Sequence, residues 1–120
     1  MNYDWLDGYA LAKPGAAEEF KVAWDALLYR VGDRMYGMKG CYKDGRPLLS
    51  VKVAPLESER LRQTYPDKII PGYYSDKRNW VSIFLDVELP REVVEKLVDD
   101  SYSLVFAKLT RKKQKEILGE

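Results

Sequence analysis

Residues 26–38 read Ala26-Leu27-Leu28-Tyr29-Arg30-Val31-Gly32-Asp33-Arg34-Met35-Tyr36-Gly37-Met38, two apolar runs separated by Gly32-Asp33. A Gly-Asp pair between runs of this kind is typical of a tight hairpin turn, so the stretch predicts two antiparallel strands. A second turn signal, Lys43-Asp44-Gly45, precedes residues 48–53, in which apolar side chains alternate with others. The sequence therefore predicts a three-stranded antiparallel meander.

Helices are predicted before and after this meander. Asn2 is placed to cap a first helix over residues 3–12, which Pro14-Gly15 ends. Pro55 opens a second helix that ends at Pro66, and Pro90 opens the longest one. The apolar face of this longest helix comprises Val94, Leu97, Val98, Val105 and Leu109. Thr110 caps a short terminal helix, residues 111–118, whose thin apolar content predicts shallow burial and fraying ends.

The remaining segments complete the predicted architecture. Glu18-Glu19 begins a stretch without a clear pattern, and residues 69–75 fit an ordered loop or a short edge strand. Residues 80–85 are almost continuously apolar, which predicts a strand inside the sheet. The order α-β-β-β-α-(β)-β-α predicts an α+β fold, a two-layer sandwich in which helices pack on one face of an antiparallel sheet. No repeat or linker divides residues 1–120, so we expect one domain.

Composition excludes several classes of function. The chain has no histidine and one cysteine, Cys41, which excludes Ser-His-Asp catalysis, histidine metal sites and an internal disulfide. No apolar run approaches the roughly 20 residues of a membrane-spanning helix, and the first residues lack a signal-peptide pattern. We therefore expect a cytoplasmic, non-enzymatic protein without a metal or cofactor. The net charge of +1 requires any nucleic-acid site to be a local patch.

Several segments together resemble the MmcQ/YjbR family. They are Pro14-Gly15 and residues 29–36, 49–53, 76–82 and 101–109, and they span nearly the whole chain. The resemblance implies a bacterial α/β sandwich related to type III secretion chaperones. It also implies DNA binding of the double-wing kind, in which β-hairpins act as wings. The family's Asn-Lys-Xaa-His-Trp pattern is Asp76-Lys77-Arg78-Asn79-Trp80 here, so we expect no role that needs its histidine.

Three groups of residues are candidates for binding nucleic acid or another ligand, because cations contact phosphates and aromatic rings stack on bases. The first group is Lys77, Arg78 and Trp80, supported by Lys52, Tyr73 and Tyr74. The second is the basic cluster Lys108, Arg111, Lys112, Lys113 and Lys115. The third, in or beside the predicted wings, is Arg34, Lys39, Lys43 and Arg46. Each group has a plainer alternative: buried aromatics, charges that complement a helix dipole, and solvated hairpin tips.

Two functions of different classes follow. The first is non-enzymatic DNA binding through the hairpins and the Lys77-Arg78-Trp80 surface, with Lys112 and Lys113 adding non-specific attraction. The second is a chaperone-like or adaptor module that binds a protein segment or a small anionic ligand against its sheet. An apolar sheet face with a free edge favours the second function. A sheet covered by helices with both edges blocked argues against it.

Overall fold

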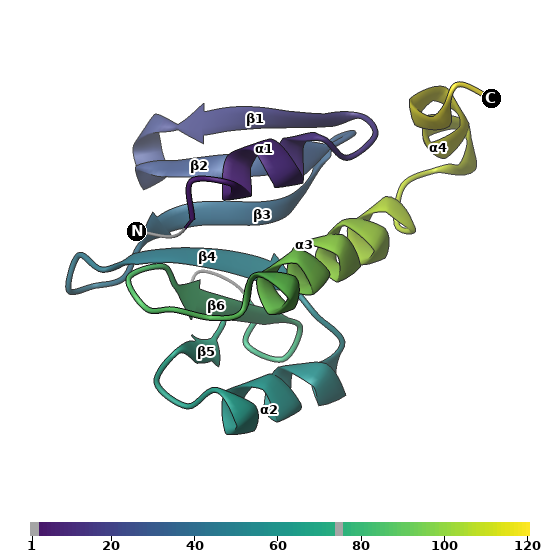
Figure 1. Ribbon diagram of the computed structural model, residues 1–120. Helices are drawn as coiled ribbons and strands as arrows, with labels where there is room; N and C mark the ends of the chain where they lie inside the picture. Colours follow the sequence, from purple (N-terminus) through teal and green to yellow (C-terminus); the bar gives the residue numbers. More distant parts are fainter. Residues whose placement is uncertain (1–2, 74–75) are drawn as a thin grey trace.

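The computed structural model describes residues 3–73 and 76–120. Its elements are α1 (Leu6–Leu11), β1 (Ala16–Lys21), the 3-10 turn η1 (Val22–Trp24), β2 (Ala26–Val31), β3 (Arg34–Cys41), β4 (Pro47–Lys52), α2 (Pro55–Thr64), β5 (Ile69–Pro71), β6 (Trp80–Phe84), α3 (Arg91–Phe106) and α4 (Arg111–Leu118). The strands form an antiparallel six-stranded sheet in the order β1-β2-β3-β4-β6-β5 (Figure 1). The predicted α+β fold is confirmed.

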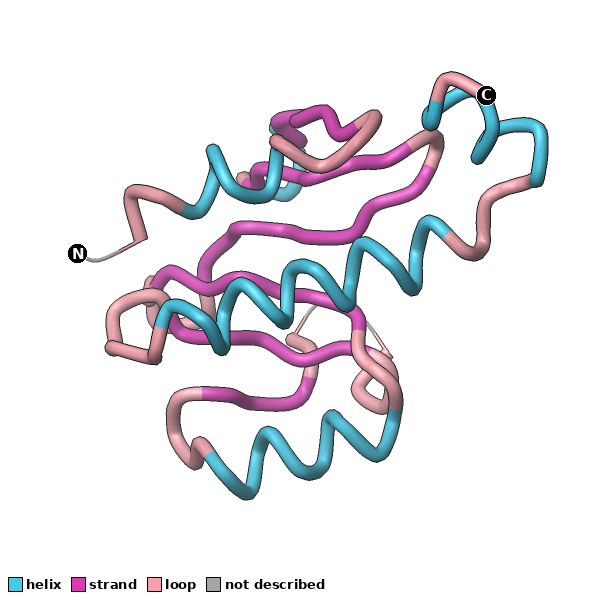
Figure 2. The backbone as a smooth tube through the Cα atoms, turned by 45° about the vertical axis from the view of Figure 1, so that its right-hand side comes forward, coloured by secondary structure: helices cyan, strands magenta, loops and turns pink. Residues whose placement is uncertain are grey.

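The main core lies between the helices and one face of the sheet. α1 and α3 cross this face, while α2 lies beside the β5 edge (Figures 1 and 2). The five side chains predicted for the apolar face of the longest helix are all buried: Val94, Leu97, Val98 and Val105 lie on α3, and Leu109 lies in the turn that follows it. They pack with Tyr29, Val51 and Val81 of the sheet, among others. Each such side chain stabilises the fold by about 1.5–3 kcal/mol through burial, so α3 is the main fastening of the helical layer.

On the opposite face of the sheet, the part over β4 and β6 is covered by loop residues and aromatic rings. At its centre, the Oγ atoms of Ser50 and Ser82 are 2.7 Å apart. The backbone N–H of Tyr73 donates to Ser82 Oγ at 3.0 Å, so the chain after β5 passes over this face. The Tyr73 ring packs on Tyr42, whose ring meets Phe84 edge-on. The polar pair at the centre is thereby satisfied beneath an aromatic cover.

The N-terminal part of the sequence prediction needs correction. α1 begins at Leu6 rather than at residue 3, and the predicted cap Asn2 lies outside the described residues. The sequence predicts no strand at Glu18-Glu19, yet Ala16–Lys21 pairs with β2 along its whole length. This strand lacks the alternating pattern because it lies at the sheet edge, where both faces are partly exposed. The meander therefore has four strands rather than three.

The other predicted elements are confirmed, with small shifts of their ends. β6 lies inside the sheet between β4 and β5, and residues 69–71 form the short edge strand. Pro55 occupies the first turn of α2, and Thr110 caps α4 by accepting a hydrogen bond from the backbone N–H of Lys113. As expected, α4 buries none of its residues. No helix in the described part of the chain combines the length and apolar character needed to cross a membrane.

Asp7 ties α1 to the sheet. The hydroxyl of Tyr29 in β2 donates to Asp7 Oδ1, and Lys39 Nζ in β3 lies 2.7 Å from the same oxygen. Burial alone would raise the pKa of Asp7, but the hydrogen bonds from Lys39 and Tyr29 lower it below its ordinary value of 3.8. Burial, together with the contact to Asp7, raises the pKa of Tyr29 far above its ordinary value. One carboxylate therefore joins three elements in its ionised form.

We expect Asp7→Asn to lower the free energy of unfolding by about 1–3 kcal/mol at neutral pH, because the buried Tyr29 hydroxyl and Lys39 lose a charged partner. A group with a lowered folded pKa stabilises above its unfolded pKa, and this stability is lost as the pH falls through the folded value. The difference between Asp7→Asn and wild type should therefore be complete above about pH 4 and shrink below it. Urea unfolding at neutral and acid pH measures it, with exposed Asp4→Asn as the control; a pH-independent difference contradicts this role.

Candidate functional site

The site forms where β3 and β4 stop pairing. Their last pair toward this end is Gly37 with Val51. Beyond it, the Ser101 hydroxyl of α3 replaces the next bonds of the ladder. Its Oγ accepts a hydrogen bond from the backbone N–H of Lys52 at 2.8 Å and donates one to the carbonyl oxygen of Tyr36 at 2.7 Å. Since Ser101 is fully buried, one helix side chain bridges the two strands where they separate.

β3 carries a bulge at the same place. Tyr29 pairs with Gly37 but the next residue, Arg30, pairs with Met35, which leaves Tyr36 as the extra residue of β3. Bulges increase the local twist of a strand and redirect the residues beyond them. Gly37 permits this arrangement, because a Cβ atom there would lie 2.5 Å from the Tyr29 ring. The start of β3 is thus free to diverge from β4.

A cavity of about 290 Å³ lies at this end of the sheet, which we call the Trp80 cavity. It is lined by Arg34, Met35, Lys52, Trp80, Val105 and Lys108. Lys52 and Trp80 are directly opposite each other on β4 and β6. Val105 lies one helical turn beyond Ser101 on α3, and Lys108 lies in the turn just after this helix ends. The cavity therefore collects three cations and an indole from separate elements.

The electrostatics of the Trp80 cavity differ from those of the other end of the sheet. Within residues 3–73 and 76–120, Arg34, Lys52 and Lys108 form no ion pair with an acidic side chain. Arg46, in contrast, donates two hydrogen bonds to Asp86, and these hydrogen bonds raise the pKa of Arg46 above its ordinary value. Unpaired cations around one cavity repel each other and attract an anion. The cavity is thus a local basic site on a nearly neutral chain.

The residues of the two predicted wings are not brought together. Arg34 begins β3, whereas Lys43 and Arg46 belong to the turn after it, and the eight residues of β3 span about 27 Å at roughly 3.4 Å each. At the far turn, Lys43 Nζ lies 5.5 Å from the centre of its neighbouring ring, Tyr42, and Arg46 is paired as described. Lys39 is held by Asp7. Of this group, Arg34 alone lines the Trp80 cavity.

Lys77 and Arg78 line a different cavity from Trp80. Asp76 fixes their turn, because its carboxylate accepts hydrogen bonds from the Arg78 backbone N–H at 2.9 Å and from Asn79 Nδ2 at 2.6 Å. These hydrogen bonds, the Arg78 one foremost, lower the pKa of Asp76. Lys77 and Arg78 face α2 across a cavity of about 310 Å³. Asn79, at the position of the histidine in the MmcQ/YjbR pattern, holds the turn together.

The other candidates lie elsewhere. Lys112 and Lys113 are exposed on α4, where Lys113 pairs with Glu116 at 3.3 Å and lines a cavity of about 510 Å³ beside the β2–β3 turn. Tyr73 belongs to the aromatic cover of the opposite sheet face. Tyr74 lies outside the described residues. None of the three described residues of this set lines the Trp80 cavity.

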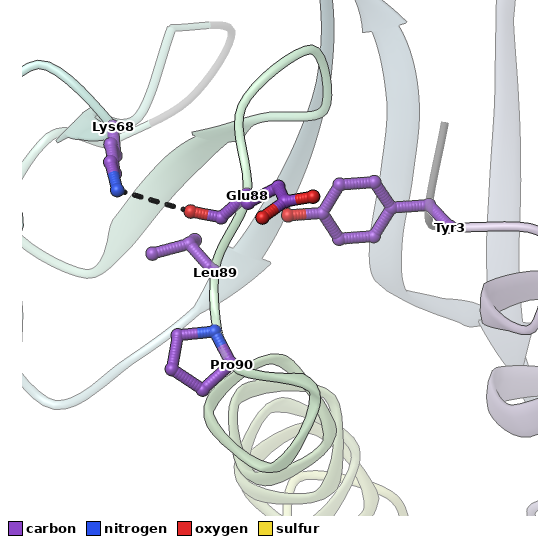
Figure 3. A pocket seen from close by; sticks show the side chains of 5 residues that line it. All are labelled: Tyr3, Lys68, Glu88, Leu89 and Pro90. Atoms are coloured by element: carbon purple, nitrogen blue, oxygen red, sulfur yellow. Dashed lines mark hydrogen bonds between the residues drawn. The ribbon is translucent and has the colours of Figure 1, made fainter.

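A cavity of about 390 Å³ near the start of α3 has a structural explanation. Tyr3 and Lys68 approach the β6–α3 connection from opposite sides (Figure 3). The Tyr3 hydroxyl donates to the carbonyl oxygen of Val87 at 2.9 Å, and Lys68 Nζ donates to that of Glu88 at 3.1 Å. Burial raises the pKa of Tyr3 above its ordinary value of 10, so its hydroxyl remains a donor at neutral pH. These contacts fasten the connection, and one cation lines this cavity against three in the Trp80 cavity.

Comparison with known proteins assigns the chain to a family. The family model described as YjbR matches residues 11–104. The chain belongs to the YjbR family. It is 34% identical over 115 residues to the uncharacterized protein YjbR of Escherichia coli K12, covering 96% of each chain. It is 32% identical over 81 residues to the uncharacterized protein YyaQ of Bacillus subtilis, covering 68% of this chain and 65% of that protein.

A solved structure agrees with this assignment. The crystal structure of Deinococcus radiodurans protein DR2400, which is described with the family-model domain DUF419, matches with a TM-score of 0.78 and 35% identity. The match covers 90% of this chain and 82% of that one. A Pseudomonas syringae protein of 24% identity shares the fold with a TM-score of 0.72. These two solved structures support the fold, and the chemistry of the site rests on its own residues.

The fold brings together residues that belong to three different groups predicted from the sequence. Arg34, Lys108 and the Lys52–Trp80 pair come from three different candidate groups, because their meeting depends on long-range pairing. Ser101 is absent from all three groups. Its signal in the sequence is a small polar residue on the otherwise apolar face of α3, spaced three and four residues from Val98 and Val105.

We expect Ser101→Ala to lower the free energy of unfolding by at least about 1–3 kcal/mol, because the buried backbone groups of Lys52 and Tyr36 lose their partner. Ser103→Ala is the matched control on the exposed side of the same helix, with an expected change within about 0.5 kcal/mol. Urea unfolding compares the two variants. Equal stability of Ser101→Ala and Ser103→Ala would show that the bridge between the strands is dispensable.

Proposed function

We propose that this YjbR-family protein is a non-enzymatic DNA-binding protein whose contact site is the Trp80 cavity rather than the pair of hairpins. One observation carries the proposal. Three cations line one cavity with the partly exposed Trp80: Arg34, Lys52 and Lys108. None of them has an acidic partner in the described chain. Cations of this kind bind phosphates, and an indole ring stacks on a base.

The shape of the cavity favours single-stranded DNA. Trp80 lines a recess of about 290 Å³ together with Met35 and Val105. An unstacked base can enter such a recess and stack on the indole, which contributes about 1–3 kcal/mol per base. The bases of a duplex are already stacked and paired, so their rings are not available to Trp80. We therefore expect a single strand to bind more tightly than a duplex of the same length.

A second candidate function, that of an adaptor, is favoured by the β1 edge of the sheet. Among the described residues, the outer edge of β1 has no strand partner, and an unpaired edge accepts an added strand. Phe20 and Trp24, in and just after β1, are 56% and 54% exposed. The β5 edge, in contrast, lies beside α2. An extended apolar peptide is the partner that fits this edge.

The DNA proposal predicts that Arg34→Ala/Lys108→Ala weakens binding of a labelled single-stranded oligonucleotide by about tenfold or more, because two charged phosphate contacts are lost. The salt dependence should also become less steep by about 1.4 in log–log slope, since each phosphate contact in a single strand contributes about 0.7. Fluorescence anisotropy over a range of salt concentrations measures both quantities for single-stranded and duplex DNA.

The matched control is Lys21→Ala/Lys43→Ala, which removes the same charge at the opposite end of the sheet. The proposal requires this control to keep nearly wild-type affinity. An equal loss in both double variants, or no binding by wild type at low salt, contradicts it. If a mononucleotide binds as tightly as the oligonucleotide, the cavity instead belongs to a small anionic ligand.

A further inference from the structure

Ser58 on α2 lacks the partner that buried hydroxyls normally have. Its Oγ is the one buried side-chain oxygen or nitrogen, among the described residues, without a hydrogen bond. The residue is 1% exposed and lines the cavity of about 310 Å³ between α2 and the 76–79 turn. Because leaving a buried hydroxyl unpaired is costly, native structures usually supply a partner from protein, solvent or ligand. Since Ser58 lines this cavity, the cavity is the space in which we look for such a partner.

Three cations line the same cavity. Arg62 comes from α2, and Lys77 and Arg78 come from the turn that Asp76 fixes. Arg62 Nε donates to the carbonyl oxygen of Ser58 at 3.3 Å, which leaves the two terminal nitrogens of its guanidinium available. Across the described chain, none of the three cations pairs with a carboxylate. A compact anion is the ligand that these donors fit.

The start of α2 adds to this positive character. The N-cap residue Ala54 has no side chain that can cap the helix, and Pro55 has no N–H. The backbone N–H groups of Leu56 and Glu57 therefore lie in the first turn without helical partners. Helix N-termini of this kind attract anions. Glu59 also lines the cavity and opposes an anion, but the three cations outnumber it.

We infer that this cavity, which we call the α2 groove, binds a phosphate group, with Ser58 Oγ and the side chains of Arg62 and Arg78 as donors. The site is independent of the DNA proposal, because no residue lines both the α2 groove and the Trp80 cavity. Its ligand chemistry is shared by inorganic phosphate, phosphate esters and the DNA backbone. The test therefore has to separate these sources.

The test is titration of the full chain with inorganic phosphate, followed by amide chemical shifts and calorimetry, with sodium chloride at equal ionic strength as the reference. We expect saturable shifts at Leu56, Ser58 and Arg78. Arg78→Ala should weaken binding about tenfold, as loss of a charged hydrogen bond predicts. Ser58→Ala should fold normally but lose most of the rise in Tm that phosphate gives the wild type. Lys43→Ala and Ser103→Ala are controls that should respond like wild type.

Two results overturn the α2 groove as a phosphate site. They are shifts that do not saturate, and equal affinities in Arg78→Ala and Lys43→Ala; either leaves water as the partner of Ser58. Two others support it and identify the source. If Arg78→Ala loses phosphate but keeps single-stranded DNA binding, the ligand is free phosphate or a monoester. If Arg78→Ala also weakens the binding of single-stranded DNA, the bound DNA contacts the α2 groove as well as the Trp80 cavity. Failure of all DNA binding overturns the Trp80-cavity proposal and leaves this one standing.

Discussion

The hydroxyl of Ser101 is the contact on which the basic end of the sheet depends. By accepting from the Lys52 backbone N–H and donating to the Tyr36 carbonyl, it satisfies both strands at the point where their ladder ends. β3 and β4 therefore separate without leaving buried groups unpaired. α3 packs closely at the separation, and this sets its last turn, with Val105, and the following connection, with Lys108, beside the strand ends. The position of the Trp80 cavity thus follows from the hydrogen bonds by which Ser101 holds α3 to the two strands.

The distribution of charge follows from the same architecture. Asp7 and Asp86 are used to hold Lys39 and Arg46, which fasten α1 and the β6–α3 connection. In the described chain, no comparable carboxylate contacts Lys52. Its neighbours are the indole of Trp80 and residues at the end of α3. At physiological salt, charges separated by more than about 8 Å are largely screened. What the cavity attracts is therefore set by its own side chains, and the net charge of +1 says little about it.

The sequence predicts local features well because they depend on neighbouring residues. Gly32-Asp33 marks its hairpin turn and Pro55 opens α2, as expected. β1 is missed because an edge strand with Glu18 and Glu19 lacks the alternation that signals a half-buried strand. The meeting of Lys52 with Trp80 depends on a register between strands that a whole helix separates in the chain. Such a pairing is decided by tertiary packing, and no local pattern contains it.

The segment Asp76-Lys77-Arg78-Asn79-Trp80 shows why a compact motif need not be one surface. Asp76 closes a turn that directs Lys77 and Arg78 toward α2. The carbonyl of Asn79 then accepts a hydrogen bond from the N–H of Val53 at 2.8 Å, and β6 begins at the next residue. That bond joins the turn to the β4–α2 connection, and Trp80 then enters the sheet opposite Lys52. Residues that precede and follow this bonded pair in the sequence therefore line two different cavities, with Lys52 and Trp80 in one and Pro55 and Arg78 in the other.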